Sequence, residues 1–251
     1  FFEKIKGVNL IQVKGPHPAG NISVQIQKHQ PLNMGEKIWE VRPEDVANIG
    51  MLFYSGEFSA QRTIAVAGSS VLKPKYIKSV IGAPVSSLID IAGVDNSFQN
   101  RFINGDVLTG ITVSENGYIN FYSNLLTIIP EGNNYRMFGW LPFKDNKIPS
   151  LSNTSLSWMF RKNGFDVNTN MNGEERAFVV TGEMEKVFPM DIFPMQLLKA
   201  CMAGDIEKME KLGIYEVVPE DFGLIDYANT SKIEAQEIIR DGIELMIKEV
   251  G

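Results

Sequence analysis

Gly15-Pro16-His17-Pro18-Ala19-Gly20 is the stretch around which the rest of this 251-residue chain is organised. An apolar run (residues 8–13) precedes it and an alternating run (residues 22–26) follows, and both flanks are predicted to be strands. Prolines fix φ and glycines permit positive φ, so a rigid, exposed turn is expected, with an imidazole at its tip. That turn either faces a ligand or merely reverses the chain with a solvated histidine.

The composition is that of a globular protein. Hydrophobic residues make up 44% of the chain and the formal net charge is −6. The absence of a basic block argues against nucleic-acid binding, because phosphate neutralisation needs clustered Lys and Arg. The single cysteine, Cys201, excludes an intrachain disulfide. The longest apolar stretches are shorter than the roughly 18–20 residues of a membrane-spanning helix, so we expect a soluble or peripheral protein.

Residues 1–61 are predicted to continue with a strand, Lys37–Val41, and a helix. Pro43 suits the first helical turn and Gly56 a helix end. Apolar residues at helical spacing predict one packed face, which comprises Val46, Ile49, Leu52 and Phe53. No glycine triplet opens a helix after a strand here, so these residues are not expected to bind a nucleotide.

Residues 62–132 are predicted to form a small unit with the element order of a β-grasp. Asn104-Gly105 and Asn116-Gly117 are ordinary turn chemistry, which favours a structural spacer over a ligand site. The expected elements are strands 63–68 and 76–80, a turn at 73–75, a helix Val85–Ala92, the run 102–110, and strands 118–122 and 125–129.

Residues 133–189 are irregular and rich in aromatic side chains. Such residues either mark an interaction surface or pack beneath a long loop. The charged run Glu174-Glu175-Arg176 is either a binding element or a solvated turn. The aromatic residues are Phe138, Trp140, Phe143, Trp158, Phe160 and Phe165.

Residues 190–251 are predicted to be helical. The first helix begins near Asp191 and Pro194 and ends at Gly204, and residues 205–212 and 234–250 form two more. Cys201 shares an apolar face with Leu197 and Leu198, so it is interpreted as a small buried hydrophobe and not as a nucleophile.

Several short sequence motifs, taken in order along the chain, resemble the A subunit of the sodium-translocating NADH:quinone oxidoreductase. The resemblance is to the later part of that protein, so we expect the chain to be a fragment that lacks a further N-terminal region. The motifs are GPHPAG (15–20), IWEVRPEDVANIGMLFYSGEF (38–58), RTIAVAG (62–68), KPK (73–75), FINGDVLTG (102–110), FGW (138–140), NGEERA (172–177) and MDIFPMQLL (190–198).

The resemblance implies an α+β multidomain chain. Its expected parts are the end of a Rossmann-like α/β domain (1–61), a β-grasp module of the soluble-ligand-binding type (62–132), an irregular connecting region (133–189) and a helical domain (190–251). The last resembles the iron–sulfur domains of related respiratory subunits. The positions of their cluster cysteines fall here on Pro219, Phe222, Ile225 and Asn229, so the domain is expected to lack a cluster.

The resemblance also implies the function. It indicates a peripheral component on the cytoplasmic face of the bacterial inner membrane, in a complex that couples quinone reduction to sodium export. FAD, FMN and iron–sulfur centres are expected only in partner subunits, with no cofactor, metal or catalytic residue in this chain. Two hypotheses stay open, a docking scaffold without a ligand site and a quinone site on Gly15, Pro16, His17, Pro18 and Gly20. An autonomous enzyme is disfavoured, because the chain has only two histidines and no nucleophile motif.

Overall fold

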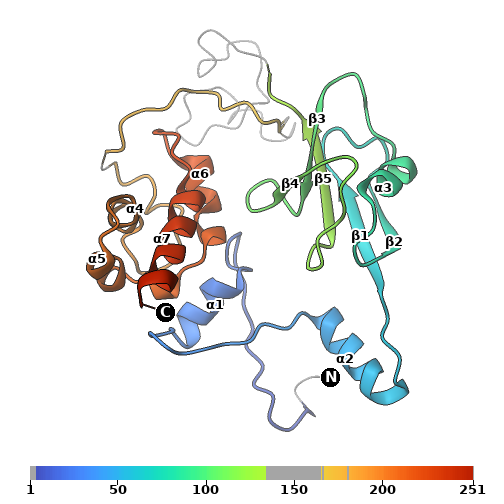
Figure 1. Cartoon of the computed structure of the whole chain (residues 1–251), viewed down its shortest axis with the longest axis horizontal. Helices are drawn as coiled ribbons and strands as arrows, with labels where there is room; N and C mark the ends of the chain where they lie inside the picture. The colour runs from blue at the N-terminus through green and yellow to red at the C-terminus, as the bar shows by residue number, and fades with distance from the viewer. Residues whose placement is uncertain (1–3, 134–164, 166, 180, 251) are drawn as a thin grey trace. The chain divides into compact units, whose positions relative to one another are not determined.

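The computed structural model describes residues 4–133, 165, 167–179 and 181–250. It is a mixed α+β structure with one five-stranded sheet and a set of C-terminal helices (Figure 1), as predicted. The chain divides into two compact units. The helical unit comprises residues 1–40 and 177–251, and the sheet unit comprises residues 41–176. The limits of the four predicted domains stay a prediction.

The sheet unit is built on a mixed sheet with the strand order β2-β1-β5-β3-β4. The central strands β1 and β5 are parallel, and the other neighbours are antiparallel. One helix, α3 (Val85–Ala92), buries Val85, Leu88 and Ala92 in the same core as the strands. The strands are β1 (Gln61–Ala67), β2 (Lys75–Val80), β3 (Asn100–Asn104), β4 (Ile111–Val113) and β5 (Leu125–Pro130).

The predicted elements of the sheet unit are largely correct. α3 has the predicted bounds, and β1, β2 and β5 lie within a residue or two of theirs. The prediction of a strand over residues 118–122 is wrong, because Tyr118 forms only an isolated bridge to Pro84. Ile119 is nevertheless buried in the core. Gly68, at the end of β1, has φ +123, and a Cβ there would lie 2.0 Å from the Ile128 carbonyl oxygen, so glycine is required.

Helix α2 (Pro43–Ser55) has the predicted limits, with Gly56 in the left-handed conformation at its end. Its predicted packed face is wrong, because α2 has no buried residue and Phe53 is 87% exposed. The helix is held instead by its first turn. Arg62 of β1 donates to Glu44 Oε2 (2.8 Å) and Asp45 Oδ1 (2.6 Å). Polar contacts therefore attach α2, and periodicity alone does not reveal whether a partner covers an apolar face.

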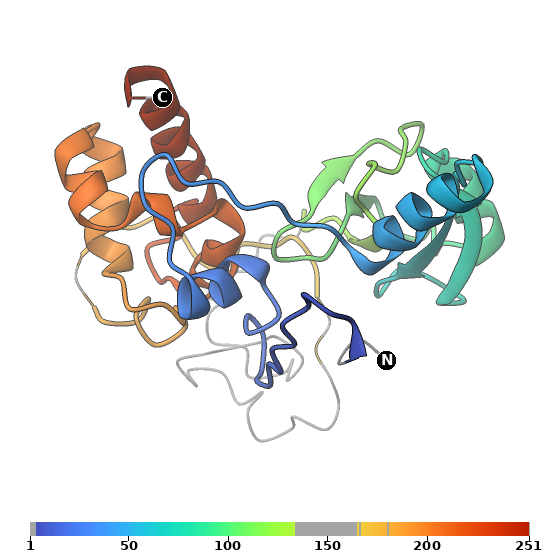
Figure 2. The same ribbon diagram turned by 90° about the horizontal axis from the view of Figure 1, so that it is seen from below.

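The helical unit contains the C-terminal helices (Figure 2). Pro194 begins α4, Gly204 ends it with φ +64, and the Asp205 side chain caps α5 by accepting from the Lys208 N–H (3.2 Å). These helices confirm the predicted ones. The elements are α4 (Pro194–Ala203), α5 (Ile206–Lys211), the 3-10 turns η3 (Ile214–Glu216) and η4 (Pro219–Phe222), α6 (Gly223–Ala228) and α7 (Ala235–Val250).

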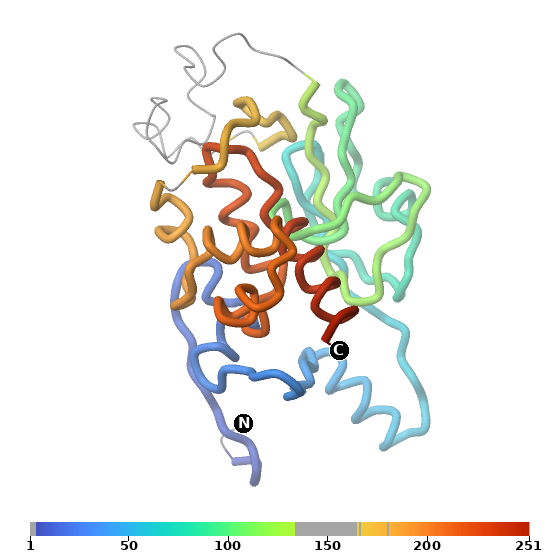
Figure 3. Tube along the Cα trace, turned by 60° about the vertical axis from the view of Figure 1, so that its left-hand side comes forward, coloured from blue at the N-terminus to red at the C-terminus, as the bar shows by residue number. Residues whose placement is uncertain are grey.

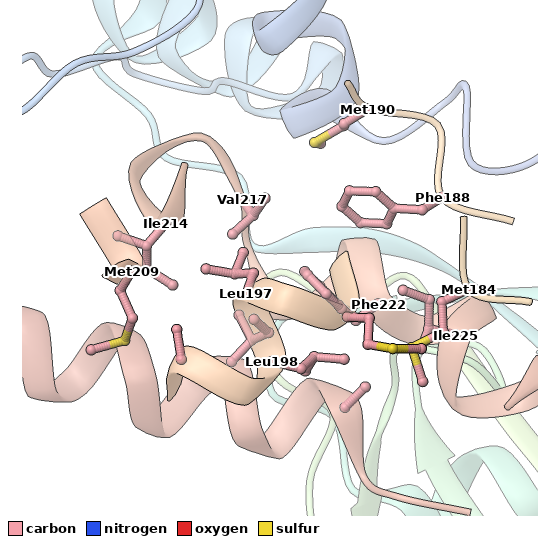
Figure 4. Packing of buried hydrophobic residues seen from close by; sticks show 14 of the residues in the cluster. Met184, Phe188, Met190, Leu197, Leu198, Met209, Ile214, Val217, Phe222 and Ile225 are labelled. Carbon is pink, nitrogen blue, oxygen red and sulfur yellow. The ribbon is translucent and has the colours of Figure 1, made fainter. Parts of the chain in front are cut away.

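One hydrophobic core fills the helical unit (Figure 4). Its side chains come from the segment before α4, from the helices and from η3 and η4. Helix α1 (Ile22–His29) adds Val24, and it lies beside the C-terminal helices (Figures 2 and 3). The buried residues labelled in the close view are Met184, Phe188, Met190, Leu197, Leu198, Met209, Ile214, Val217, Phe222 and Ile225.

Three predicted strands near the N-terminus are wrong. Residues 22–26 belong to α1, and residues 8–13 and 37–41 have no regular secondary structure. The alternation Ile22, Val24, Ile26 also puts Ile22 and Ile26 one helical turn apart, so a run of five residues does not distinguish the two periods. Burial of Ser23 and Val24 in the helical unit decides the conformation.

Candidate functional site

The Gly15–Gly20 stretch forms two successive turns that lead into α1. The Ala19 N–H donates to the Pro16 carbonyl (2.9 Å), and the Asn21 N–H donates to the Pro18 carbonyl (2.8 Å). The Gln25 side chain returns from α1 and donates to the Ala19 carbonyl (3.2 Å). Pro18 is buried and His17 is exposed. The predicted turn with an exposed imidazole is therefore present, although neither Gly15 nor Gly20 uses a positive φ.

An open hollow of about 430 Å³ lies beside these turns, within the range of small-molecule sites. Its apolar lining comprises Val13, Pro16, Pro18, Ala19, Val24 and Pro189. Its polar lining comprises Gln12, Lys14, His17, Gln25, Lys28 and His29. Both histidines of the chain thus line one hollow, which sequence reasoning did not foresee for His29. No acidic side chain is among the described residues that line it.

A buried hydrogen bond fixes α1, and with it the turn, to the C-terminal helices. Ser23 Oγ donates to Asp221 Oδ1 (2.5 Å), and both residues are buried. The Val218 N–H donates to the other carboxylate oxygen (3.0 Å). Burial raises the pKa of Asp221, while the bonds from Ser23 and Val218 oppose that rise. Nothing in the sequence indicates this contact, because its partners are 198 positions apart.

The four positions predicted to have lost cluster ligands lie in η4, in α6 and just after α6. Phe222 and Ile225 are fully buried core residues, and Pro219 begins η4. Asn229 is also buried, and its amide donates to the carbonyls of Ile225 (3.0 Å) and Ile233 (3.2 Å). Three of these side chains therefore serve packing and loop closure. Among the described residues there is no group of three or more His, Cys, Asp or Glu that could hold a metal ion.

Asp226 is a second carboxylate that sequence reasoning missed, and it is partly buried. It accepts hydrogen bonds from the Ala235 N–H (2.5 Å) and from Gln236 Nε2 (2.7 Å), so it caps the start of α7. Burial raises the pKa of Asp226, and these bonds lower it in part. These contacts give Asp226 a structural role, in which it joins the end of α6 to the start of α7.

Cys201 packs against the core from α4, close to Gly242 of α7. Burial raises the pKa of its thiol to about 11, so little thiolate exists near neutral pH. This environment agrees with the predicted packing role.

Glu174, Glu175 and Arg176 are exposed, and Phe165 is exposed as well. Most of the predicted aromatic surface lies outside the described residues, including Phe138, Trp140, Phe143, Trp158 and Phe160. The interaction surface predicted for these aromatic residues therefore stays a prediction.

Two family models match the chain. The model described as the NqrA second alpha/beta domain matches residues 1–58. The model described as the NQRA C-terminal domain matches residues 63–115. Among the described residues, none of the helices combines the length and the apolar character that a bilayer crossing needs.

Three curated relatives are named as the A subunit of the Na(+)-translocating NADH-quinone reductase. The protein of Neisseria meningitidis serogroup B is 34% identical over 98% of the chain and 55% of its own length. That of Marinomonas sp. is 35% identical (96% and 54%), and that of Hahella chejuensis is 37% identical (97% and 54%). The chain spans about half the length of these relatives. Matched along almost its whole length, the chain belongs to the family of NqrA, the A subunit of the Na⁺-translocating NADH-quinone reductase.

Proposed function

We propose that the chain works as part of the A subunit of a Na⁺-translocating NADH-quinone reductase, in which it contributes to quinone reduction coupled to sodium export. The observation that carries this proposal is the similarity to relatives of that name over 98% of the chain. The protein is peripheral and lies on the cytoplasmic face of the bacterial inner membrane. FAD, FMN and iron–sulfur centres belong to its partner subunits, and this chain binds none of them.

The same proposal assigns the folds of the parts. Residues 62–132, within the sheet unit, are a β-grasp module of the soluble-ligand-binding type, which is supported by the hairpin β1–β2, the following helix α3 and the parallel central pair β1–β5. Residues 1–61 are the end of a Rossmann-like domain. The C-terminal helices are an iron–sulfur-type domain without a cluster, which is supported by the core side chains at Phe222 and Ile225.

Within this function, the hollow beside Gly15–Gly20 binds the head group of a quinone. His17 is an exposed lining residue and donates a hydrogen bond to a quinone carbonyl. The rings of Pro16 and Pro18 and the Val24 side chain give the hollow apolar walls against which a flat ring can pack. The bond from Ser23 to Asp221 keeps these walls in place.

The test is the binding of a water-soluble short-chain quinone to the full-length protein. His17→Ala should weaken saturable binding about tenfold, which corresponds to about 1.4 kcal/mol. Lys211→Ala is the matched control, since Lys211 is an exposed residue of α5 that does not line the hollow. Equal affinity of His17→Ala and wild type for the quinone would show that the quinone does not bind at this turn.

A docking scaffold without a ligand site is the second candidate, and one observation favours it. Phe53 and Tyr54 are 87% and 92% exposed, and both belong to α2, a helix without buried residues. Aromatic side chains so exposed are typical of a surface that a partner protein covers. The double variant Phe53→Ala/Tyr54→Ala should then reduce the yield of assembled complex. An unchanged yield would contradict this role.

A further inference from the structure

The hollow beside Gly15–Gly20 is lined by cations and neutral groups. Lys14 and Lys28 are both exposed lining residues, and the two histidines, His17 and His29, are the other ionisable ones. Lys28 and His29 occupy the last turn of α1. Asp221, the carboxylate in contact with α1, is buried, hydrogen-bonded to Ser23 and absent from the lining.

A hollow with this lining should distinguish charge states of a ligand. A neutral quinone carbonyl accepts a hydrogen bond from an imidazole or an ammonium group but gains little from the net charge of Lys14 and Lys28. An ionised ring oxygen gains the same hydrogen bond, made stronger by the charge, and a Coulomb attraction to both lysines. Because no carboxylate is among the described lining residues, none of these groups repels that oxygen.

We infer that this hollow binds quinoid rings that carry a negative charge in preference to uncharged rings of the same shape. The inference rests on the proposed quinone site and adds to it the charge of the favoured ligand. The apolar walls formed by Pro16, Pro18 and Pro189 select a flat ring over a small inorganic anion, which has no apolar face to pack. The lysines supply the preference for charge, and the walls supply the preference for a ring.

Two naphthoquinones form a matched pair of probes. Near neutral pH, 2-hydroxy-1,4-naphthoquinone is ionised, whereas 2-methoxy-1,4-naphthoquinone has nearly the same shape and no charge. The affinity of the full-length protein for each is measured by titration at low and at high salt. The anion should bind roughly three- to tenfold more tightly, as expected for one or two exposed charge pairs, and salt should reduce the difference.

The double variant Lys14→Gln/Lys28→Gln should bring the affinity for the anion down to that for the neutral probe, with the neutral probe unaffected. Lys211→Gln, which removes a charge from α5 outside the lining, should keep the preference. A thermal unfolding midpoint equal to that of wild type shows that each variant is folded. Preference that persists in the double variant, or that is lost in Lys211→Gln as well, would overturn the assignment to this hollow.

The remaining outcomes separate this inference from the function beneath it. Equal binding of both probes to the wild type overturns the charge preference and leaves the quinone site standing. Failure of both probes to bind overturns the quinone site together with the preference. Displacement of the anionic probe by inorganic phosphate at equal concentration would show a general anion site and would overturn the preference for a ring.

Discussion

Ser23 Oγ of α1 lies 2.5 Å from Asp221 Oδ1 of η4, and this buried hydrogen bond joins parts of the chain that are 198 positions apart. It fixes the helix that directly follows the His17 turn. Val24, the next residue, enters the core of the same unit. One polar and one apolar contact thus determine where the turn lies relative to the C-terminal helices.

Ser23→Ala should destabilise the helical unit by about 1–3 kcal/mol, because it leaves a buried carboxylate with one partner fewer. Urea unfolding followed by far-UV circular dichroism measures the change. The exposed neighbour Ile22 offers a control, since Ile22→Ala alters the same turn of α1 without touching Asp221. A loss no larger in Ser23→Ala than in Ile22→Ala would contradict the importance of the buried bond.

Asp221→Asn should change the pH dependence of stability. Burial raises the pKa of Asp221, so the folded protein holds this proton more tightly than the unfolded chain. The resulting stabilisation is complete below the ordinary pKa of about 3.9 and is lost as the pH rises through the raised folded value. The variant should lack that decline.

The measurement is the free energy of unfolding at several pH values from about 4 upward, as a difference between wild type and variant. Groups whose pKa is lowered, such as Glu131 and Asp205, contribute equally to wild type and variant, so their contributions cancel in this difference. Asp241→Asn, on the exposed side of α7, controls for the change in net charge. A flat difference between wild type and Asp221→Asn would disprove this prediction.

Arg62→Met should loosen α2. The Arg62 side chain is almost fully buried, and it lies between Glu44, Asp45 and the ring of Phe121, whose centroid is 5.6 Å away. The two acids are partly exposed, so the loss should be about 1–3 kcal/mol, below that of a fully buried pair. Hydrogen exchange of α2 amides should accelerate.

Arg62→Lys is the matched variant, because an ammonium group keeps the charge but not the forked geometry that reaches both acids. It should recover part of the lost stability. Protection of α2 that is unchanged in Arg62→Met would show that other contacts hold the helix.

Gly242→Ala should strain the crossing of α4 and α7. A Cβ at Gly242 would lie 2.6 Å from Cys201 Sγ and 3.1 Å from its Cβ. Overpacking of this kind costs about 1–3 kcal/mol, which exceeds the gain of up to about 1 kcal/mol in helix propensity. In the double variant with Cys201→Ala, the cost should be smaller than the sum of the single changes. Additive losses in thermal or urea unfolding would contradict a direct clash.

The elements that could be predicted from the sequence are those with local signals. Pro43 and Gly56 bound α2, Pro194 and Gly204 bound α4, and caps of this kind need no knowledge of the tertiary structure. The three-residue strand β4 was missed, because Ile111–Val113 is too short to show a period.

The parts that could not be predicted depend on distant partners. Helix α1 is decided by burial against residues near position 221, and the exposure of α2 depends on what does or does not cover it. At the candidate site, the turn and His17 were found from their own residues. His29 and Asp221 were not, because only the fold brings them near that turn.

Residues 1–40 and 177–251 form one unit, and this has a consequence for folding during translation. On the ribosome, α1 emerges long before the helices of its unit. The sheet unit is a continuous stretch of sequence between the two parts, so it is synthesised in the meantime. At roughly 5–20 residues per second, the apolar side of α1 waits on the order of ten seconds or more for its partners. During that interval the nascent α1 segment lacks the core that buries Ser23 and Val24 in the folded unit.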